Sequence, residues 1–328
     1  MEKKNFDPEK VKQAFNRAAE EAGKFAGSAA AKAKDAASAS KKAIVHAVDQ
    51  NGNGEIDIED IIILGLKTPG IRINRDEFLR KEFFKRYSAD TVEKAVATTP
   101  AKAAIPSQDI DHIADEVIKY ERNCVSGISA LLGMPGGMVM LATIPADIAQ
   151  YYGYMLRAAQ KLMYLYGFPQ IDMHGDGPAL DTETINVMTI CLGVMYGVAG
   201  ANKAIKAMAQ ALAVGVEKKL MQKALTKGTI YPIVKNVAKW FGVKMTKDMF
   251  AGFFKKAIPV VGGAVGGGIT YLSFKPCCDR LKSSLQDTLL SNPNHAVDES
   301  ENIIIDAEYT IDPDEDLDDD SHQQGSNE

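Results

Sequence analysis

An uncharged stretch interrupted by glycine constrains the fold of this chain more than any other feature. From Asn123 to Leu156 the only formal charge is Asp147, and glycines with one proline interrupt the run at residues 133–137. Glycine accepts positive φ and proline cannot continue a helix, so this cluster predicts a turn between two helices. Pro145 then predicts a new helix start. We therefore expect a helical hairpin that is buried, in protein or in lipid.

The second helix of this hairpin has an apolar stripe whose members recur at alternating steps of four and three residues. The stripe consists of Ile148, Tyr152, Met155, Ala159, Leu162 and Tyr166. Asp147 has two interpretations. In the first turn of a helix it satisfies free amide groups, which is the interpretation we favour. In lipid, the same acid would be a candidate ion or proton relay.

A twelve-residue loop from Asp49 to Asp60 is the most specific local motif. Oxygen-bearing side chains stand at positions 1, 3, 5, 9 and 12, position 7 supplies a backbone carbonyl, and Gly54 occupies the sharp turn at position 6. The predicted ligands are Asp49, Asn51, Asn53, Glu55, Asp57 and Asp60. The loop resembles the EF-hand family over about residues 42–67. This resemblance implies Ca²⁺, with Mg²⁺ as the alternative because Asp60 replaces the usual glutamate.

An Asn/Gly turn between two helices uses the same residue types and remains the other interpretation of this loop. EF-hands normally occur in pairs, and the nearest second candidate, residues 172–183, matches the pattern poorly. Asp172, His174 and Asp176 within it form a weak candidate for a transition metal.

Charge is distributed unevenly along the 328 residues, which carry a net charge of −5. No Lys or Arg follows Lys282, and 14 acidic residues lie from Asp287 onward. The preceding chain holds 38 basic against 29 acidic residues, a net charge of +9. A basic body predicts an anionic partner, here a membrane surface or a membrane protein rather than nucleic acid. The acidic tail would compete for that site or keep the protein soluble.

Two further apolar segments follow the hairpin. Residues 185–202 and 257–274 are uncharged, and the second contains Gly262/Gly266 and Gly263/Gly267 pairs that allow close approach of helices. Both segments are near the lower length limit for crossing a bilayer, and the mean hydropathy is −0.14. We therefore favour a soluble or peripheral protein over an integral or pore-forming one.

The order of these segments resembles the EcsC family of bacterial proteins over about residues 105–285. The resemblance is carried by Gly133–Met140, Thr143–Asp147, Tyr166-Gly167-Phe168 and Ile258–Gly268. It implies a helical fold. It implies little chemistry, because the biochemical role of this family is not established.

These patterns predict an all-α chain in four parts. The parts are an N-terminal helical module with the EF-hand-like loop (residues 1–87), a linker (88–106), an EcsC-like domain with Gly-rich helical hairpins (107–290) and a disordered acidic tail (291–328). Within the first part, apolar residues from 11 to 29 predict an amphipathic helix.

We found no motif of a known catalytic type. The four cysteines (Cys124, Cys191, Cys277 and Cys278) lack metal-site spacing, and the N-terminus lacks the apolar run of a secretory signal. We predict that these thiols are reduced, as in a cytoplasmic protein. The protein is expected in the cytoplasm, with peripheral attachment to the inner membrane or insertion in it as possibilities. The predicted function is that of a non-enzymatic, divalent-cation-binding protein, membrane-associated or regulatory. An integral pore former and an enzyme with an unrecognised site are the alternatives.

Overall fold

The computed structural model describes residues 48–132, 139–171, 181–216, 218–242, 262–292, 294–296 and 298–304. These residues form helices and connecting turns without a strand, so the all-α prediction is confirmed. The helices are α3 (Ile58–Lys67), α4 (Arg75–Phe83), α5 (Ala89–Ala97), α6 (Ser107–Leu132), α7 (Val139–Leu165), α8 (Thr182–Met195), α9 (Ala201–Val214), α10 (Lys218–Thr226), α12 (Gly262–Gln286) and the short 3₁₀ helix η1 (Glu299–Glu301). Residues 231–242 are also helical. The amphipathic helix predicted at 11–29 lies outside the described residues.

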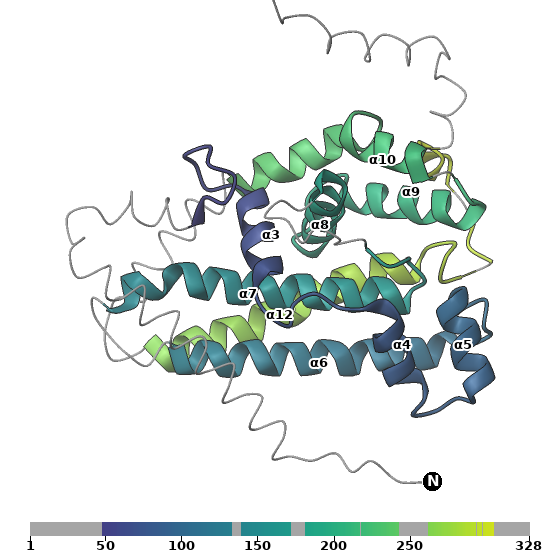
Figure 1. Cartoon of the computed structure of the whole chain (residues 1–328), viewed down its shortest axis with the longest axis horizontal. Helices are drawn as coiled ribbons and strands as arrows, with labels where there is room; N and C mark the ends of the chain where they lie inside the picture. The colour runs from purple at the N-terminus through teal and green to yellow at the C-terminus, as the bar shows by residue number, and fades with distance from the viewer. Residues whose placement is uncertain are drawn as a thin grey trace, which may run out of the picture.

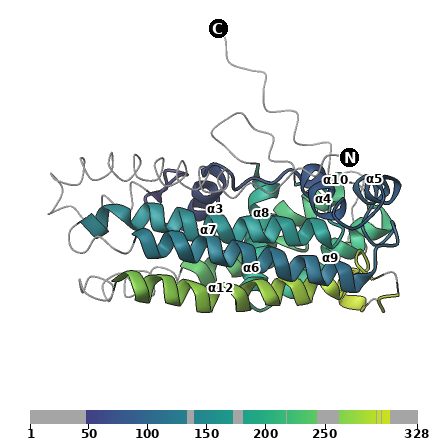
Figure 2. The same cartoon turned by 90° about the horizontal axis from the view of Figure 1, so that it is seen from below.

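Three long helices lie side by side along the long axis of the molecule (Figures 1 and 2). Helix α6 contacts both α7 and α12, and α7 and α12 also contact each other. The chain runs along α6 and back along α7, while α12 begins at the end where α6 finishes (Figure 1). The helices on either side of the predicted turn, α6 and α7, are thus part of a three-helix layer, while the turn itself, residues 133–137, lies outside the described residues.

Helices α8 and α9 lie against this layer, and α10 packs on α8. Helix α8 contacts α3, α7, α9, α10 and α12, and every residue from Thr184 to Met195 is buried. A helix that is apolar on all sides needs such complete cover. The uncharged segment that begins at residue 185 is therefore, in this structure, a helix enclosed by protein.

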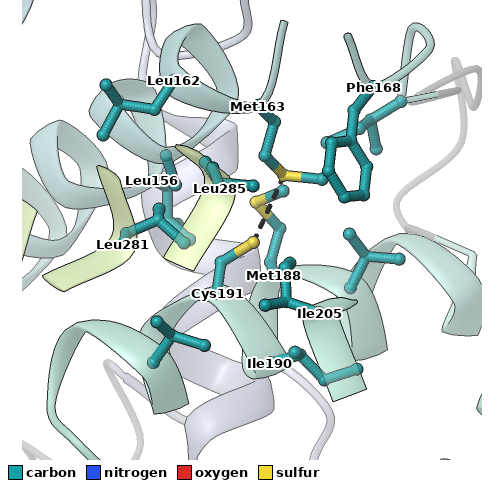
Figure 3. Packing of buried hydrophobic residues seen from close by; sticks show 14 of the residues in the cluster. Leu156, Leu162, Met163, Phe168, Met188, Ile190, Cys191, Ile205, Leu281 and Leu285 are labelled. Atoms are coloured by element: carbon teal, nitrogen blue, oxygen red, sulfur yellow. Dashed lines mark hydrogen bonds between the residues drawn. The ribbon is translucent and has the colours of Figure 1, made fainter. Parts of the chain in front are cut away.

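The core is continuous from the N-terminal helices to the C-terminal one. Figure 3 shows its centre, where Met163 of α7, Cys191 of α8 and Leu281 of α12 meet. The Cys191 thiol donates to Met163 Sδ over 3.3 Å. Five members of the predicted α7 stripe are buried: Tyr152, Met155, Ala159, Leu162 and Tyr166. The same cluster includes Ile61 and Leu66 of α3, so the first predicted part has no core of its own.

The segment predicted to be a linker, residues 88–106, is instead structured. Ser88 caps α5, whose Val92, Ala95 and Val96 are buried. The buried guanidinium of Arg75 donates to Val96 O over 2.7 Å and to Thr98 O over 3.0 Å. The carbonyls at a helix C-terminus lack partners within the helix, and a cation from α4 satisfies them here. The low-complexity sequence gave no sign of that distant partner.

The first part of the segment predicted to be a disordered tail is also packed. Ile304 is fully buried and Glu301 is 3% exposed, while η1 contacts α9. His295 lies between two carboxylates, with Nδ1 3.0 Å from Asp287 Oδ1 and Nε2 3.0 Å from Glu301 Oε2. Residues 305–328, which hold most of the acidic run, lie outside the described residues.

Candidate metal centre

The loop from Asp49 to Asp60 turns twice through the left-handed region. Gly52 has φ = 77° and Gly54 has φ = 84°. Both are values that glycine adopts without steric cost. Gly54 occupies the position where the sequence predicted a sharp turn. Asn51 to Glu55 are exposed to solvent, so an ion can reach the loop without an opening motion.

The side chains at positions 1, 3 and 5 turn inward onto the backbone of the loop. Asp49 accepts hydrogen bonds from Gly52 N (2.6 Å) and Gly54 N (2.8 Å) through its two carboxylate oxygens. Asn51 Oδ1 accepts from Asn53 N over 3.1 Å, and Asn53 Oδ1 accepts from Glu55 N over 2.8 Å. These side-chain oxygens therefore lie on the inner side of the turn.

Asp57, at position 9, joins the loop to α3. Its Oδ2 accepts from Asn51 Nδ2 (3.3 Å) and Asn53 Nδ2 (2.9 Å). Its Oδ1 accepts from the backbone amides of Glu59 and Asp60 at the start of α3. Positions 3, 5 and 9 of the predicted ligand set thus converge. The amide groups of the two asparagines meet Asp57 through nitrogen here, and a cation requires their oxygens.

Asp60, at position 12, closes the loop. Its Oδ1 accepts from Gln50 N (2.7 Å) and Asn51 N (3.1 Å), and its Oδ2 accepts from Asp57 N (2.9 Å). The side chain is fully buried. Burial raises the pKa of Asp60, and the backbone hydrogen bonds only partly oppose this shift. The shorter side chain at position 12 therefore ties the two ends of the loop together.

The residues present fit a hard cation in donor chemistry, because all the side-chain donors are carboxylate or amide oxygens. The set depends on two asparagines and a backbone carbonyl as well as on three carboxylates. Within the described part of the chain, no three His, Cys, Asp or Glu side chains gather into a metal-binding group. The weak transition-metal candidate at Asp172, His174 and Asp176 lies outside the described residues.

Close backbone packing couples the loop to the long helices. Helix α3 contacts α7, and a Cβ placed on Gly65 would lie 3.3 Å from Gly153 N. The segment after α3 continues along α7, where Arg157 Nη1 donates to Gly70 O over 2.8 Å. Gln160 donates to Ile71 O (3.1 Å) and accepts from Ile73 N (3.0 Å). A shift of α3 would therefore displace the residues of α7 that contact it.

A buried ionic cluster between α6 and α7 was not predicted from the sequence. Glu121 is fully buried, and its Oε1 lies 2.5 Å from Lys161 Nζ and 3.2 Å from Arg157 Nε. The second contact is ionic only, since Arg157 Nε makes no hydrogen bond. Glu121 Oε2 is buried without a hydrogen-bond partner. Burial lowers the pKa of Lys161, and Glu121 opposes that effect. In the sequence, the available signal was the position of Glu121, a charged residue on the apolar face of α6.

The other residues singled out from the sequence do not form a second site among the described residues. The backbone of Asp147 lies in α7, eight positions after its first residue, so Asp147 is not in the first turn of a helix and the interpretation favoured from the sequence is wrong. Its side chain lies outside the described part. Tyr152 is buried and its ring stacks edge-on against Tyr151. Burial raises the pKa of Tyr152 and of Tyr154, the latter to about 12. The four cysteines are free thiols, as predicted.

Two findings bear on the wider interpretation. Searches with this chain match no protein-family model, no curated protein and no solved structure. The likeness to the EcsC and EF-hand families therefore stays a prediction from residues. Among the described helices, none has both the length and the apolar composition needed to cross a bilayer.

Proposed function

We propose that this protein binds a divalent cation in the loop from Asp49 to Asp60 and acts as a regulatory binding protein. Ca²⁺ is the preferred ion and Mg²⁺ the alternative, because a shorter acid at position 12 reaches less far. The convergence of Asn51, Asn53 and Asp57 is the observation that supports this proposal most directly. In a plain turn, those three side chains need not meet.

The bound ion would supply a positive charge to a loop whose predicted ligands include three carboxylates, Asp49, Asp57 and Asp60. The side chains of Asp49, Asn51, Asn53, Asp57 and Asp60 and the carbonyl of Glu55 would hold it. Coordination by the asparagine oxygens would replace the amide contacts with Asp57. The ion would thereby stiffen the start of α3, which packs on α7.

Calorimetric titration of the full chain with Ca²⁺ and Mg²⁺ tests the proposal. Asp49→Asn and Glu55→Gln make a matched pair, because each removes one negative charge from the same loop. Asp49 contributes side-chain oxygens and Glu55 a backbone carbonyl, so we expect at least a tenfold affinity loss in Asp49→Asn alone. Absence of binding heat for both ions would contradict the proposal. Equal losses in the two variants would reduce the effect to general electrostatic attraction.

We further propose that the protein works at an anionic membrane surface, to which it attaches peripherally. The net charge of +9 before Asp287 supports this part. Flotation of the full chain with phosphatidylserine vesicles, with and without Ca²⁺, tests it. Binding that weakens with added salt is expected. Equal recovery with neutral and anionic vesicles would count against it.

A variant that ends at Ile304 tests the role of the acidic residues beyond the described part. If the acidic tail competes with the vesicles for the basic part of the chain before Asp287, removal of the tail increases recovery with anionic vesicles. Unchanged recovery would assign the tail to solubility alone.

A further inference from the structure

We infer that one end of the long-helix layer, where α6 ends and α7 and α12 begin, enters one leaflet of an anionic bilayer. This inference rests on the proposed membrane association and names the surface responsible for it. The region, called here the uncharged end, consists of residues 123–132 of α6, 139–146 of α7 and 262–274 of α12. Among its described side chains, Asn123, Tyr271 and Leu272 are exposed. No acidic or basic residue occurs in any of the three ranges.

Topology brings the three ranges together. They are far apart in the sequence, yet the C-terminal end of α6 and the N-terminal ends of α7 and α12 lie at the same end of the layer (Figures 1 and 2). The contacts of α6 with α7 and of α12 with α6 keep the three side by side. The charged residues of the same three helices lie toward the other end of the layer.

The lengths of the ranges match one leaflet rather than a whole bilayer. At 1.5 Å per residue, residues 123–132 extend about 15 Å, residues 139–146 about 12 Å and residues 262–274 about 20 Å. The hydrocarbon core of a bilayer is about 30 Å thick, so one leaflet offers about 15 Å. The first charged residues back along the helices are Arg122, Asp147 and Lys275. They therefore define a boundary at about the depth of the headgroups.

The side chains at this boundary have the chemistry of a membrane interface. The guanidinium of Arg122 lies 3.9 Å from the ring centroid of Tyr271. Among the described residues, no carboxylate lies within ion-pair distance of Arg122. Next to Tyr271, Leu272 is 74% exposed, more than any other large apolar side chain in the described part of the chain. Tyrosine and arginine at the edge of an apolar surface are typical of headgroup contact, because each combines an apolar body with a polar tip.

Charge favours a lipid partner over a second copy of the chain. The body carries net positive charge, and like-charged surfaces repel on self-association. An anionic leaflet instead offers phosphates to Arg122 and hydrocarbon to the uncharged end. A protein partner or a dimer is therefore an outcome that the experiment must be able to reveal.

Depth-dependent quenching locates the contact. The probe is Leu272→Trp in a Trp240→Phe background, bound to phosphatidylserine/phosphatidylcholine vesicles that contain brominated lipid. The matched control places the same reporter at Phe84, which is 50% exposed and directly follows α4. Helix α4 lies beside the other end of the long-helix layer (Figure 1). We expect quenching of at least twofold at position 272 and none at position 84. A bound protein whose position 272 is not quenched would overturn the inference and leave the membrane association standing.

Charge substitution provides an independent test by vesicle binding. Arg122→Glu/Leu272→Glu should lower the partition coefficient at least tenfold. Phe84→Glu/Lys94→Glu changes the net charge equally at exposed positions and should stay within twofold of the unmodified protein. Because Leu272 is largely exposed, Leu272→Glu alone replaces the double variant if the latter does not fold. Equal losses in the test and control variants would overturn the inference.

Two further outcomes separate the inference from the function on which it rests. If the unmodified protein binds no vesicle while calorimetry shows the cation, the membrane proposal and this inference both fail and the cation site stands. If light scattering shows a dimer that Leu272→Glu dissociates, the uncharged end is a contact between copies and the lipid assignment is wrong.

Discussion

Gly65 of α3 packs against the backbone of Gly153 of α7, and a Cβ on either glycine would crowd its neighbours. A Cβ on Gly65 would be 2.9 Å from Leu156 Cδ1 and 3.3 Å from Gly153 N, and a Cβ on Gly153 would be 3.2 Å from Ile71 Cγ1. This contact holds the helix that follows the candidate ion loop against the centre of the molecule. Through this contact, the cation-binding loop is coupled to α7, one of the three helices of the proposed membrane-contacting end.

Alanine at either glycine should destabilise the protein. We expect Gly65→Ala and Gly153→Ala each to lower the free energy of unfolding by about 1–3 kcal/mol, because a Cβ on Gly65 crowds α7 and a Cβ on Gly153 crowds Ile71. Urea unfolding measures the change. Gly127→Ala is the control, since a Cβ on Gly127 of α6 meets nothing within 4 Å. That variant should be unchanged or more stable by about 0.5–1 kcal/mol. Equal stability of all three variants would refute the close approach.

Arg75 should hold α5 to the rest of the molecule. Its guanidinium is buried and donates to Val96 O, Thr98 O and Phe168 O. Arg75→Lys keeps the charge but loses the fork of donors, so we expect a loss of about 3 kcal/mol in unfolding free energy. Hydrogen exchange should increase over residues 89–98. Arg80→Lys, at an exposed pair with Glu93, should cost less than about 1 kcal/mol.

Cation binding should depend on the protonation of Asp60. Its pKa is raised above the ordinary 3.8 by burial. The folded state therefore favours protonated Asp60. This stabilisation is present below the unfolded pKa and is lost as pH rises through the folded pKa. A cation favours the carboxylate instead, so the thermal shift caused by Ca²⁺ should be large at pH 7 and shrink as pH falls through the raised pKa. Asp49→Asn should show little Ca²⁺ shift at any pH. A shift that grows on acidification would contradict the assignment.

The buried pair of Glu121 and Lys161 should be costly to break and inexpensive to replace. Glu121→Gln leaves the ammonium of Lys161 buried without its counter-charge, and we expect a loss of about 3–5 kcal/mol. Glu121→Leu/Lys161→Leu removes both charges and should lose much less. Chemical unfolding of the single and double variants measures the difference. If the stability lost in the double variant equals the sum of the losses in the two single variants, Glu121 and Lys161 act independently and the expected coupling is absent.

His295 should anchor the start of the tail. Both ring nitrogens face carboxylate oxygens, from Asp287 on one side and Glu301 on the other. Asp287 is in turn held by Lys206, which lowers the pKa of Asp287. His295→Phe removes both contacts, and hydrogen exchange over residues 298–304 should rise at least tenfold. His112→Phe is the control, because His112 is exposed. Unchanged exchange in both variants would show that Ile304 alone anchors the segment.

Short-range patterns of the sequence determined several features of this protein. The period of the apolar residues predicted helices throughout, and the stripe on α7 is buried from Tyr152 to Tyr166. Gly54 predicted a sharp turn, and the backbone there is in the left-handed region. These features depend on residues within one or two turns of each other, and local sequence contains the necessary information.

Only the tertiary structure decided the contacts between distant residues. The segment 88–106 resembles a linker because its apolar residues are few, yet Arg75 supplies the missing partner for α5. Residues up to Ile304 pack because α9 lies opposite them. The uncharged end exists only because α12 begins beside the end of α6. In each case, the stabilising group lies tens of residues away, so a pattern read over a few turns does not contain it.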